Sequence, residues 1–409
     1  MKAKTKTTAT KEEATPALVP KLRFPEFREA LEWEKKPLAA CLDYQQPTPY
    51  LVSGTNYSPA FKTPVLTAGK TFILGYTDEE HGIFNEDLPV IIFDDFTTAT
   101  QFVDFPFKAK SSAMKILQAK NGANIKFMFE TLRTLSYEVG AHERHWISNF
   151  APMLVPVPKP AEQQKIAECL SSVDELIAAQ ARKVDALKTH KKGLMQQLFP
   201  REGETQPRLR FPEFQNAGGW VSEPLGDLGE IVTGKTPSTK ELDLWGGDIL
   251  FITPTDISED DKYQYTTART VIETKSTKIL PPGSVVYTCI ASIGKMALTV
   301  HPSITNQQIN AVVPNEKALG EFIYYALLNL TPWIKTLPAT NTLPIINKTD
   351  FSKIAILFPE DKAEQQRITD CLTSLDALIA AQTQKHEALK THKKGLMQQL
   401  FPSPEEVAG

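Results

Sequence analysis

Two short patterns in this sequence have the residue types that nucleotide chemistry would use. Residues 229–236, GEIVTGKT, satisfy the phosphate-loop pattern GxxxxGK[ST], in which backbone N–H groups and a lysine hold phosphates. Residues 90–95, VIIFDD, resemble the apolar strand whose terminal acid holds magnesium in such ATPases. However, Glu-Ile-Val-Thr inside the loop is typical of a strand, and Pro237 leads into no apolar helix. The acidic strand also precedes the loop and lies in the other half of the chain, so we expect no nucleotide site.

Other candidate catalytic patterns are incomplete. His142 and His145 could begin a metal site, but the sequence around them offers no third ligand. Glu273 and Lys275 have the ExK spacing of nuclease sites, yet no aspartate-bearing strand precedes them. The cysteines have no metal-binding or redox spacing, and we expect them to be reduced thiols: Cys41, Cys169, Cys289 and Cys371. The sequence therefore predicts no catalytic residue, no metal and no cofactor.

The composition is that of a globular protein, with 41% hydrophobic and 23% charged residues. No apolar run is long enough for a membrane span or a secretory signal, so we expect a cytoplasmic protein without a membrane partner. The formal net charge of −3 argues against a protein that grips nucleic acid by bulk electrostatics. Any nucleic-acid contact would need locally concentrated positive charge, or a partner that supplies the phosphate contacts.

An internal duplication positions everything else in the chain. The 40 residues 161–200 (AEQQKIAECL…KKGLMQQLFP) return at 363–402 with 30 identities at an offset of 202. A second repeat, PKLRFPEF at 20–27, returns as PRLRFPEF at 207–214, and a tryptophan follows each copy, Trp33 and Trp220. The segments between these repeats differ from each other. The chain is therefore one scaffold, built twice, that carries two unlike heads.

Each 40-residue repeat predicts a long helix of about 57 Å with a heptad seam. Pro160 can start the first helix, and Pro200 and Pro402 can stop the two. Two tandem copies that close about a two-fold axis would make the helices antiparallel, with the heads at opposite ends. The first seam runs through Ile166, Leu170, Val173, Ile177, Gln180, Val184, Leu187, Lys191, Leu194 and Leu198, and the second through the positions 202 residues later. The polar seam residues predict a fixed register or partner.

The two heads share an order of elements, but their polar loops differ. Strands near 89–93 and 284–288 run into the loops DDFTTATQ and CIASIGK, and a short helix follows in each head. Such loops hold side chains that can pair with base edges. Candidates in the first head are Lys70, Thr71, Thr97, Thr98, Lys108, Lys110, Ser111, Ser112, Arg144 and His145. In the second head they are Lys235, Thr236, Ser238, Ser292, Lys295, Asn306, Gln307 and Gln308.

These motifs resemble those of the specificity subunits of type I restriction-modification systems. The resemblance rests in the second head on TGKTPS (233–238), WGGDILFITPTDI (245–257), LPPGSVVYTCIASIGK (280–295) and TNQQIN (305–310). In the first head it rests on PVLTAGKTFILGYT (64–77), PVIIFDDFTT (89–98) and FPFKAKSSAMKIL (105–117), and AEQQ[KR]I opens both long helices. The family implies two target-recognition domains that read a two-part, asymmetric site on double-stranded DNA. It also implies two modification (methyltransferase) subunits on the helices, and ATP-dependent restriction subunits that join them.

The expected fold is α+β: two strand-rich target-recognition domains separated by two long antiparallel coiled-coil helices, with pseudo-two-fold symmetry. The expected segments are a tail (1–19), the first head (20–158), a helix (159–200), a linker (201–214), the second head (215–358), a helix (359–402) and a tail (403–409). Three alternatives stay open from the residues: a specificity chain of another restriction class, a nucleotide-dependent enzyme built on GEIVTGKT, and a coiled-coil scaffold unrelated to DNA.

Overall fold

The computed structural model describes residues 18–67, 69, 71–135, 137, 144–274, 278–337 and 345–402. The contacts divide the chain into two units. The first contains the residues up to Gln180 and those from Lys385 on, and the second spans Ala181–Gln384. Two long helices, α3 (Pro160–Leu198) and α7 (Lys362–Leu400), therefore each contribute one part to each unit.

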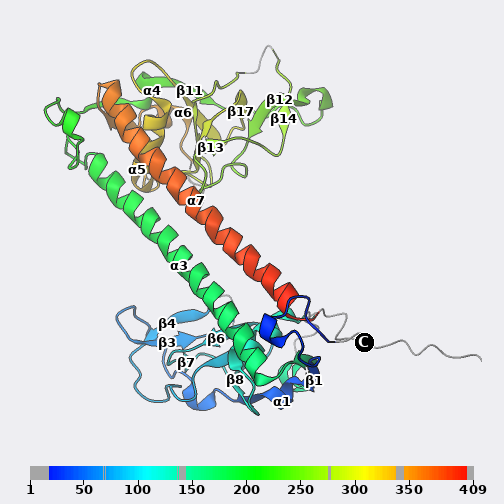
Figure 1. Ribbon diagram of the computed structural model, residues 1–409. Helices are drawn as coiled ribbons and strands as arrows, with labels where there is room; N and C mark the ends of the chain where they lie inside the picture. Colours follow the sequence, from blue (N-terminus) through cyan, green and yellow to red (C-terminus); the bar gives the residue numbers. More distant parts are fainter. Residues whose placement is uncertain are drawn as a thin grey trace, which may run out of the picture. The chain divides into compact units, whose positions relative to one another are not determined.

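The residues of the first unit that the structure describes form three sheets, several of whose strands are labelled in Figure 1. Its central sheet has the antiparallel order β2-β8-β5-β6, and β5 is rich in buried β-branched residues, as expected for a strand covered on both faces. The sheets are β2 (Leu42–Gln45), β8 (Met114–Ala119), β5 (Val90–Asp94) and β6 (Thr100–Val103); β4 (Ile73–Thr77), β3 (Thr63–Leu66) and β7 (Lys108–Ala109); and β1 (Glu34–Pro37) with β9 (Leu154–Val157). The helices besides α3 and α7 are η1 (Pro25–Phe27), α1 (Leu38–Cys41), η2 (Thr48–Tyr50), α2 (Ile125–Thr134) and the π-helix η3 (Trp146–Phe150).

The second unit repeats this plan with one further strand, β13. Its sheets are β11 (Gly229–Thr233), β18 (Ile309–Pro314), β15 (Val285–Thr288), β16 (Met296–Thr299) and β13 (Tyr263–Gln264); β14 (Thr270–Val271), β12 (Trp245–Ile252) and β17 (Ser303–Thr305); and β10 (Val221–Pro224) with β19 (Ala355–Phe358). The helices are η4 (Pro212–Phe214), α4 (Leu225–Leu228), η5 (Leu242–Leu244), α5 (Gly320–Ile334) and α6 (Lys348–Ser352).

Strand pairing relates the two units element by element. The order β2-β8-β5-β6 matches β11-β18-β15-β16, with antiparallel pairs throughout. In the three-stranded sheets, β3 pairs antiparallel with β4 and parallel with β7, as β12 does with β14 and β17. The two heads are therefore two versions of one fold, which confirms the common order of elements.

The predicted seams are on the inner side of the long helices. Every seam position from Ile166 to Leu198, and every equivalent position from Ile368 to Leu400, is buried or half-buried. In the first unit the end of α7 lies beside the start of α3, because Leu400 and Phe401 share a hydrophobic core with Ile166. In the second unit the end of α3 lies beside the start of α7 in the same way. Antiparallel packing is thus present in each unit.

A buried carboxylate at the start of each long helix explains the second repeat. Glu162 accepts two hydrogen bonds from the guanidinium of Arg23, from Nε at 2.7 Å and from Nη2 at 2.7 Å. The same carboxylate accepts a third bond, at 3.3 Å, from the indole N–H of Trp33. Arg210 and Trp220 bind Glu364 in the same manner. RFPEF, the tryptophan and the helix start are repeated together because they form one buried anchor.

The glutamine that follows each anchoring glutamate ties the head to the helix. Gln163 accepts a hydrogen bond from the backbone N–H of Asn124, directly before α2, at 2.9 Å. Gln365 accepts the equivalent bond from Leu319, directly before α5, at 2.9 Å. The AEQQ motif is therefore a structural joint between each head and its long helix.

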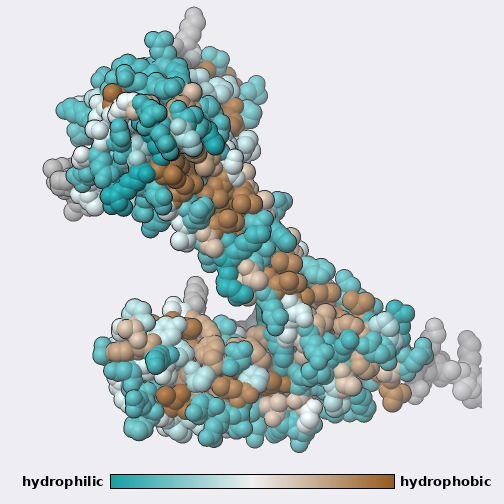
Figure 2. Space-filling view, turned by 60° about the vertical axis from the view of Figure 1, so that its left-hand side comes forward, coloured by the Kyte–Doolittle hydropathy of each residue, from teal (hydrophilic) through white to brown (hydrophobic). Residues whose placement is uncertain are grey.

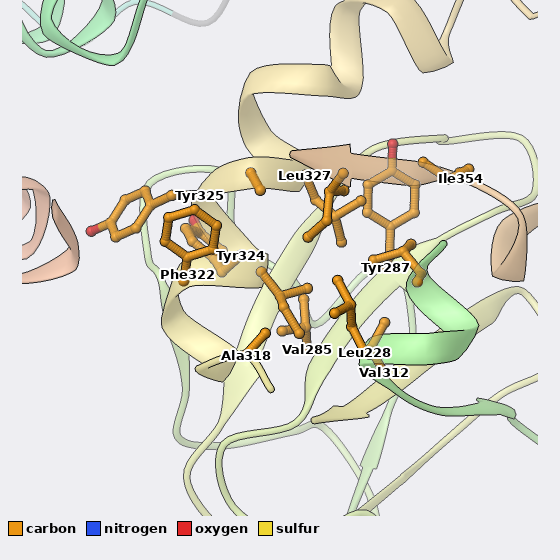
Figure 3. Packing of buried hydrophobic residues seen from close by; sticks show 14 of the residues in the cluster. Leu228, Val285, Tyr287, Val312, Ala318, Phe322, Tyr324, Tyr325, Leu327 and Ile354 are labelled. Atoms are coloured by element: carbon orange, nitrogen blue, oxygen red, sulfur yellow. The ribbon is translucent and has the colours of Figure 1, made fainter. Parts of the chain in front are cut away.

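The hydrophobic core of the second unit forms between its main sheet and α5. Figure 3 shows Val285 and Val312 from the sheet, Leu228 from α4 and Phe322 from α5 packed together. Among the described residues, no helix is both long and apolar enough to cross a membrane. The expected α+β class and the two long helices are confirmed.

We expect Glu364→Ala to lower the free energy of unfolding by about 3–5 kcal/mol, because Arg210 would keep its charge in a buried place without the carboxylate that balances it. The measurement is urea denaturation of the full chain. The matched control is Glu213→Ala, which removes an ion pair to Arg367 whose side chains are both 48% exposed, and which should cost about 0–1 kcal/mol. Equal losses in the two variants would contradict the anchor.

Candidate nucleic-acid interface

Three loops of the second unit meet at one edge of its main sheet. Thr233, the last residue of β11, lies opposite Asn310 of β18, and Thr288, the last of β15, lies opposite Ile309. In antiparallel pairs the end of one strand lies beside the start of the next, so the loops that follow β11, link β15 to β16 and precede β18 share this edge. They contain all the second-head candidates: Lys235, Thr236, Ser238, Ser292, Lys295, Asn306, Gln307 and Gln308.

The first unit builds the same edge from β5, β6 and β8. Asp94 at the end of β5 lies opposite Met114 at the start of β8, and β6 begins beside Phe93. The edge brings together Thr97, Thr98, Lys110, Ser111 and Ser112. Arg144 is held near this edge by the residue that follows it. The backbone N–H of His145 donates to the carbonyl of Asp95, directly after β5, at 2.9 Å. In the second unit the backbone N–H of Ile346 makes the equivalent hydrogen bond, to the carbonyl of Cys289 directly after β15.

The loop that connects the two strands of each central hairpin, β5 to β6 and β15 to β16, contains one residue other than glycine in the left-handed region. Thr98 has φ of 58° and Ala291 has φ of 61°. Such angles are uncommon for residues other than glycine, and such strained residues often cluster at functional sites. A side chain of the preceding strand holds each loop: Asp94 Oδ1 accepts from the N–H of Thr97 at 2.9 Å, and Thr288 Oγ1 accepts from the N–H of Lys295 at 2.9 Å. The two loops are thus fixed by different local bonds.

Hydrogen bonds organise the amide-rich loop of the second unit. Thr236 Oγ1 donates to Gln307 Oε1 at 2.8 Å, which joins the loop after β11 to the loop before β18. Asn306 Nδ2 donates to Gln308 Oε1 at 3.0 Å, and Asn306 Oδ1 accepts from the N–H of Gln308 at 3.0 Å. Gln307 is exposed, and Asn306 and Gln308 are half-buried. The amides are therefore held in a defined arrangement at the surface.

Two hollows flank this edge. One, of about 700 Å³, lies between the loop after β11 and the β14-β12-β17 sheet, and Lys235, Thr236 and Ser238 line it. The other, of about 620 Å³, contains Ser292 and Lys295 together with Lys335 from the end of α5. The second-unit candidates thus divide into two groups on one edge, and the hollows offer lysines and hydroxyls to a polar ligand.

The first-unit candidates differ in exposure. Thr71, Thr97, Ser111, Ser112 and Arg144 are exposed, and Thr98 and Lys110 are half-buried. The ammonium of Lys110 lies 5.7 Å from the ring centroid of Tyr57, within the range of a cation–π contact. Lys70 lies outside the described residues. The contacts of these residues with a ligand stay predictions.

Two first-unit candidates have structural partners inside the fold. The ammonium of Lys108 is buried and pairs with Glu79 at 2.9 Å. The N–H of Gly54 lowers the pKa of Glu79 most, burial opposes this shift, and Lys108 adds to it. His145 is fully buried, with its Nδ1 3.2 Å from the hydroxyl of Tyr137. In this structure neither side chain reaches the surface of the edge.

Sequence reasoning missed the polar pair beneath each edge. In the first unit, Lys115 and Asp95 form a buried ion pair at 3.3 Å. At the equivalent place, Asn310 Nδ2 donates to Cys289 Sγ at 3.3 Å. Burial raises the pKa of the Cys289 thiol to about 11, although bonds from Asn310 oppose the shift. No spacing in the sequence relates these partners. Lys335 and Tyr57 were missed too, because each meets its loop only through the fold.

The phosphate-loop pattern has the wrong structure for nucleotide binding. Residues 229–233 of GEIVTGKT form the strand β11, and the next helical element after the loop is the single turn η5. A phosphate loop needs a helix whose N-terminus receives the phosphates. VIIFDD belongs to β5 of the other unit. The sequence-based rejection of a nucleotide site is therefore supported by the local structure.

Comparisons with known proteins identify similar chains. A family model described as "Type I restriction modification DNA specificity domain" matches residues 217–391. The Escherichia coli type I restriction enzyme EcoR124I/EcoR124II specificity subunit is 35% identical over 409 residues, which cover 93% of this chain and 97% of that one. The MjaIX specificity subunit of Methanocaldococcus jannaschii is 30% identical over 42% of this chain and 41% of its own.

Solved structures share the fold. The crystal structure of the S subunit of a type I restriction-modification system from M. genitalium aligns with a TM-score of 0.62 at 17% identity, and covers 94% of this chain and 100% of its own. A structure titled for the complex assembly and conformational transition of the type I R-M system aligns with a TM-score of 0.55 at 17% identity, and covers 90% and 99%.

We expect Gly234→Ala to displace the loop after β11. A Cβ at this position would lie 2.2 Å from Thr305 Oγ1 and 2.3 Å from the backbone oxygen of Asn306. Hydrogen exchange of the loop amides should therefore accelerate, and the melting temperature should fall by several degrees, as for a loss of about 1–3 kcal/mol. The control Gly218→Ala, whose Cβ would meet no atom within 4 Å, should change neither. Unchanged exchange in Gly234→Ala would contradict the close packing of the two loops.

Proposed function

This chain belongs to the specificity subunits of type I restriction-modification enzymes, and we propose that its two heads each read one half of an asymmetric, two-part DNA target. Specificity subunits are the non-catalytic components that supply sequence recognition. One observation carries the proposal: two heads with the same strand pairing present different side chains at the same edge. A scaffold built twice with two unlike edges suits two unlike half-sites. We assign the heads to residues 20–158 and 215–358.

Direct reading of bases would use the amides and hydroxyls at each edge. Asn and Gln can pair bidentately with adenine, and Lys or Arg with guanine. In the second head, the amides of Asn306 and Gln307, each held by a hydrogen bond to another loop residue, suit an adenine edge. Lys235 suits a backbone phosphate. In the first head, the loop before β8 is equivalent to the loop that contains Asn306 and Gln307, and it offers Lys110 and the exposed hydroxyls of Ser111 and Ser112. Both edges would enter the major groove.

Partner subunits would supply much of the phosphate binding. The chain has a net charge of −3, so its own field does not favour DNA in bulk. Modification subunits that enclose the DNA would add the missing positive charge. These partners would also perform the adenine N6 methylation, and ATP-dependent restriction subunits would perform the cleavage. We place the complex in the cytoplasm, because the DNA that it would methylate and cleave is found there.

The long helices offer two equivalent docking faces for modification subunits. Apolar patches interrupt a mostly hydrophilic surface (Figure 2). Among the exposed apolar residues are Leu176 on α3, 57% exposed, and Leu378 on α7, 43% exposed. These residues are equivalent at the offset of 202. Two equivalent faces support a complex with two modification subunits, one on each.

The relatives favour this function over the alternatives. The curated relatives reported above are named as subunits of type I enzymes. Residues 229–233 form a strand, which leaves GEIVTGKT without a phosphate loop. These observations disfavour a specificity chain of another restriction class and a nucleotide-dependent enzyme, and the match to a DNA specificity domain disfavours a scaffold unrelated to DNA.

The test of the proposed function is single-molecule sequencing of DNA from cells that express this chain with its modification subunit. We expect N6-methyladenine in one asymmetric motif, with two parts and a gap of fixed length. The motif should be absent when the chain is omitted. A stable complex of the two proteins that methylates no such motif would contradict the proposal.

We also propose that the long helices measure the gap between the half-sites. Deleting one heptad from each helix, residues 177–183 and 379–385, removes about 10 Å of helix, which is the rise of about three base pairs. The unread gap in the methylated motif should shorten by about that amount, with both half-sites unchanged. A gap of the original length would refute this measuring role.

A further inference from the structure

A buried charged cluster joins three helices in the first unit. The ammonium of Lys393 on α7 donates to Glu130 Oε1 on α2 at 2.8 Å, and to the two carboxylate oxygens of Asp174 on α3 at 2.7 and 2.9 Å. Lys126 of α2 bridges the same two acids, at 2.8 Å to Glu130 and 2.7 Å to Asp174. Glu130 is fully buried and Lys393 is 5% exposed. One cation of the seam is therefore held both by the opposite long helix and by the head.

A related cluster joins three helices in the second unit. Lys191 on α3 pairs with Asp376 on α7. The hydroxyl of Tyr325 on α5 donates to Asp376 Oδ2 at 2.6 Å, and the Lys191 ammonium lies 5.5 Å from the centroid of the same ring. Figure 3 shows the hydroxyl of Tyr325 pointing away from the hydrophobic core to which its ring belongs. The head again contacts the seam pair directly.

The two clusters are versions of one device. Asp174 and Asp376 are related by the offset of 202, and so are Lys191 and Lys393. The head residues of the two clusters also occupy equivalent positions. Glu130 and Tyr325 each lie six residues after the residue, Asn124 or Leu319, whose backbone N–H binds the glutamine at the helix start. The lysine–aspartate pair is thus common to both units, whereas the head residue that completes it differs.

The charges make the position of each helix definite. Burial opposes ionisation of Asp174, but hydrogen bonds from Lys126 and Lys393 outweigh it and lower the pKa of this carboxyl. Buried ion pairs add little net stability compared with apolar contacts, and their best-attested use is to fix register. A slip of one heptad would exchange mostly apolar seam residues for one another. However, it would carry each lysine about 10 Å from its carboxylates.

We propose that Lys191 with Asp376 and Tyr325, and Lys393 with Asp174 and Glu130, are positioning residues that fix each head on the long helices and so restrict the enzyme to one gap length in its DNA target. This inference rests on the proposed function. The proposed function already takes the length of the helices to set the gap; what the inference adds is that these two polar clusters restrict the enzyme to a single gap length.

The test replaces both seam lysines, as Lys191→Met/Lys393→Met, in the full chain assembled with its modification subunits. Methylated sites are then sequenced and sorted by gap length. We expect methylation at the same two half-sites. The fraction of methylated sites with other gap lengths should rise by about tenfold or more, because the loss of one charge-assisted hydrogen bond changes an equilibrium by about that factor. Lys191→Arg/Lys393→Arg, which keeps the charges, should return the methylation toward one gap.

The matched control is Lys192→Met/Lys394→Met, which removes the exposed lysines one residue further along each helix and should leave a single gap. A second variant, Asp174→Asn/Asp376→Asn, keeps side-chain shape while weakening both clusters, and should also relax the gap. The inference is overturned if the variants keep the single gap, lose methylation at all gaps alike, or fail to assemble while the control assembles. Absence of any two-part motif with the unaltered chain would instead refute the proposed function.

Discussion

One buried interaction, repeated in each unit, holds the architecture together: a glutamate at the start of a long helix binds an arginine and a tryptophan. Glu162 and Glu364 join each helix start to an RFPEF segment and a tryptophan that lie 129 to 154 residues earlier in the chain. A buried carboxylate must be fully paired, and two bonds from one guanidinium with one from an indole meet this demand with little freedom in geometry. The next glutamine then fixes the head helix. The duplication preserves these residues together because none of them can be buried alone.

Backbone pairing within the sheets sets where the edge loops lie. Backbone pairing aligns the end of β5 with the start of β8, and the end of β15 with the start of β18. The position of each loop thus depends on strands whose side chains are buried in apolar cores. Residues in the loops can change while this pairing stays the same. The loops between β5 and β6 and between β15 and β16 are equivalent, and they carry Thr97 and Ser292. The loops before β8 and before β18 are also equivalent, and they carry Ser111 and Gln307.

The sequence predicted features that repeat or alternate, and it failed where a contact depends on folding. The long helices and their seams followed from heptad periodicity and from the offset of 202, and the common order of elements in the heads followed from matching strand-like and polar segments, because these signals are local or duplicated. Lys108 and His145 looked like surface residues in polar segments. Lys108 is buried because it forms an ion pair with Glu79, which lies 29 residues earlier in the chain. The pairs beneath the edges, Lys115 with Asp95 and Asn310 with Cys289, likewise join residues that no pattern connects.

The buried polar groups separate what the two heads share from what distinguishes them. The anchors and the lysine–aspartate pairs belong to the scaffold and occur twice. Where head meets scaffold, the first unit uses Glu130 and the second Tyr325. Beneath the edges, the two units use an ion pair and an amide–thiol contact. A change of one member would leave a buried charge or dipole unpaired, at a cost of several kcal/mol for a charge. The exposed loop residues, or an entire head, can therefore be replaced with less loss of stability than single residues beneath the loops.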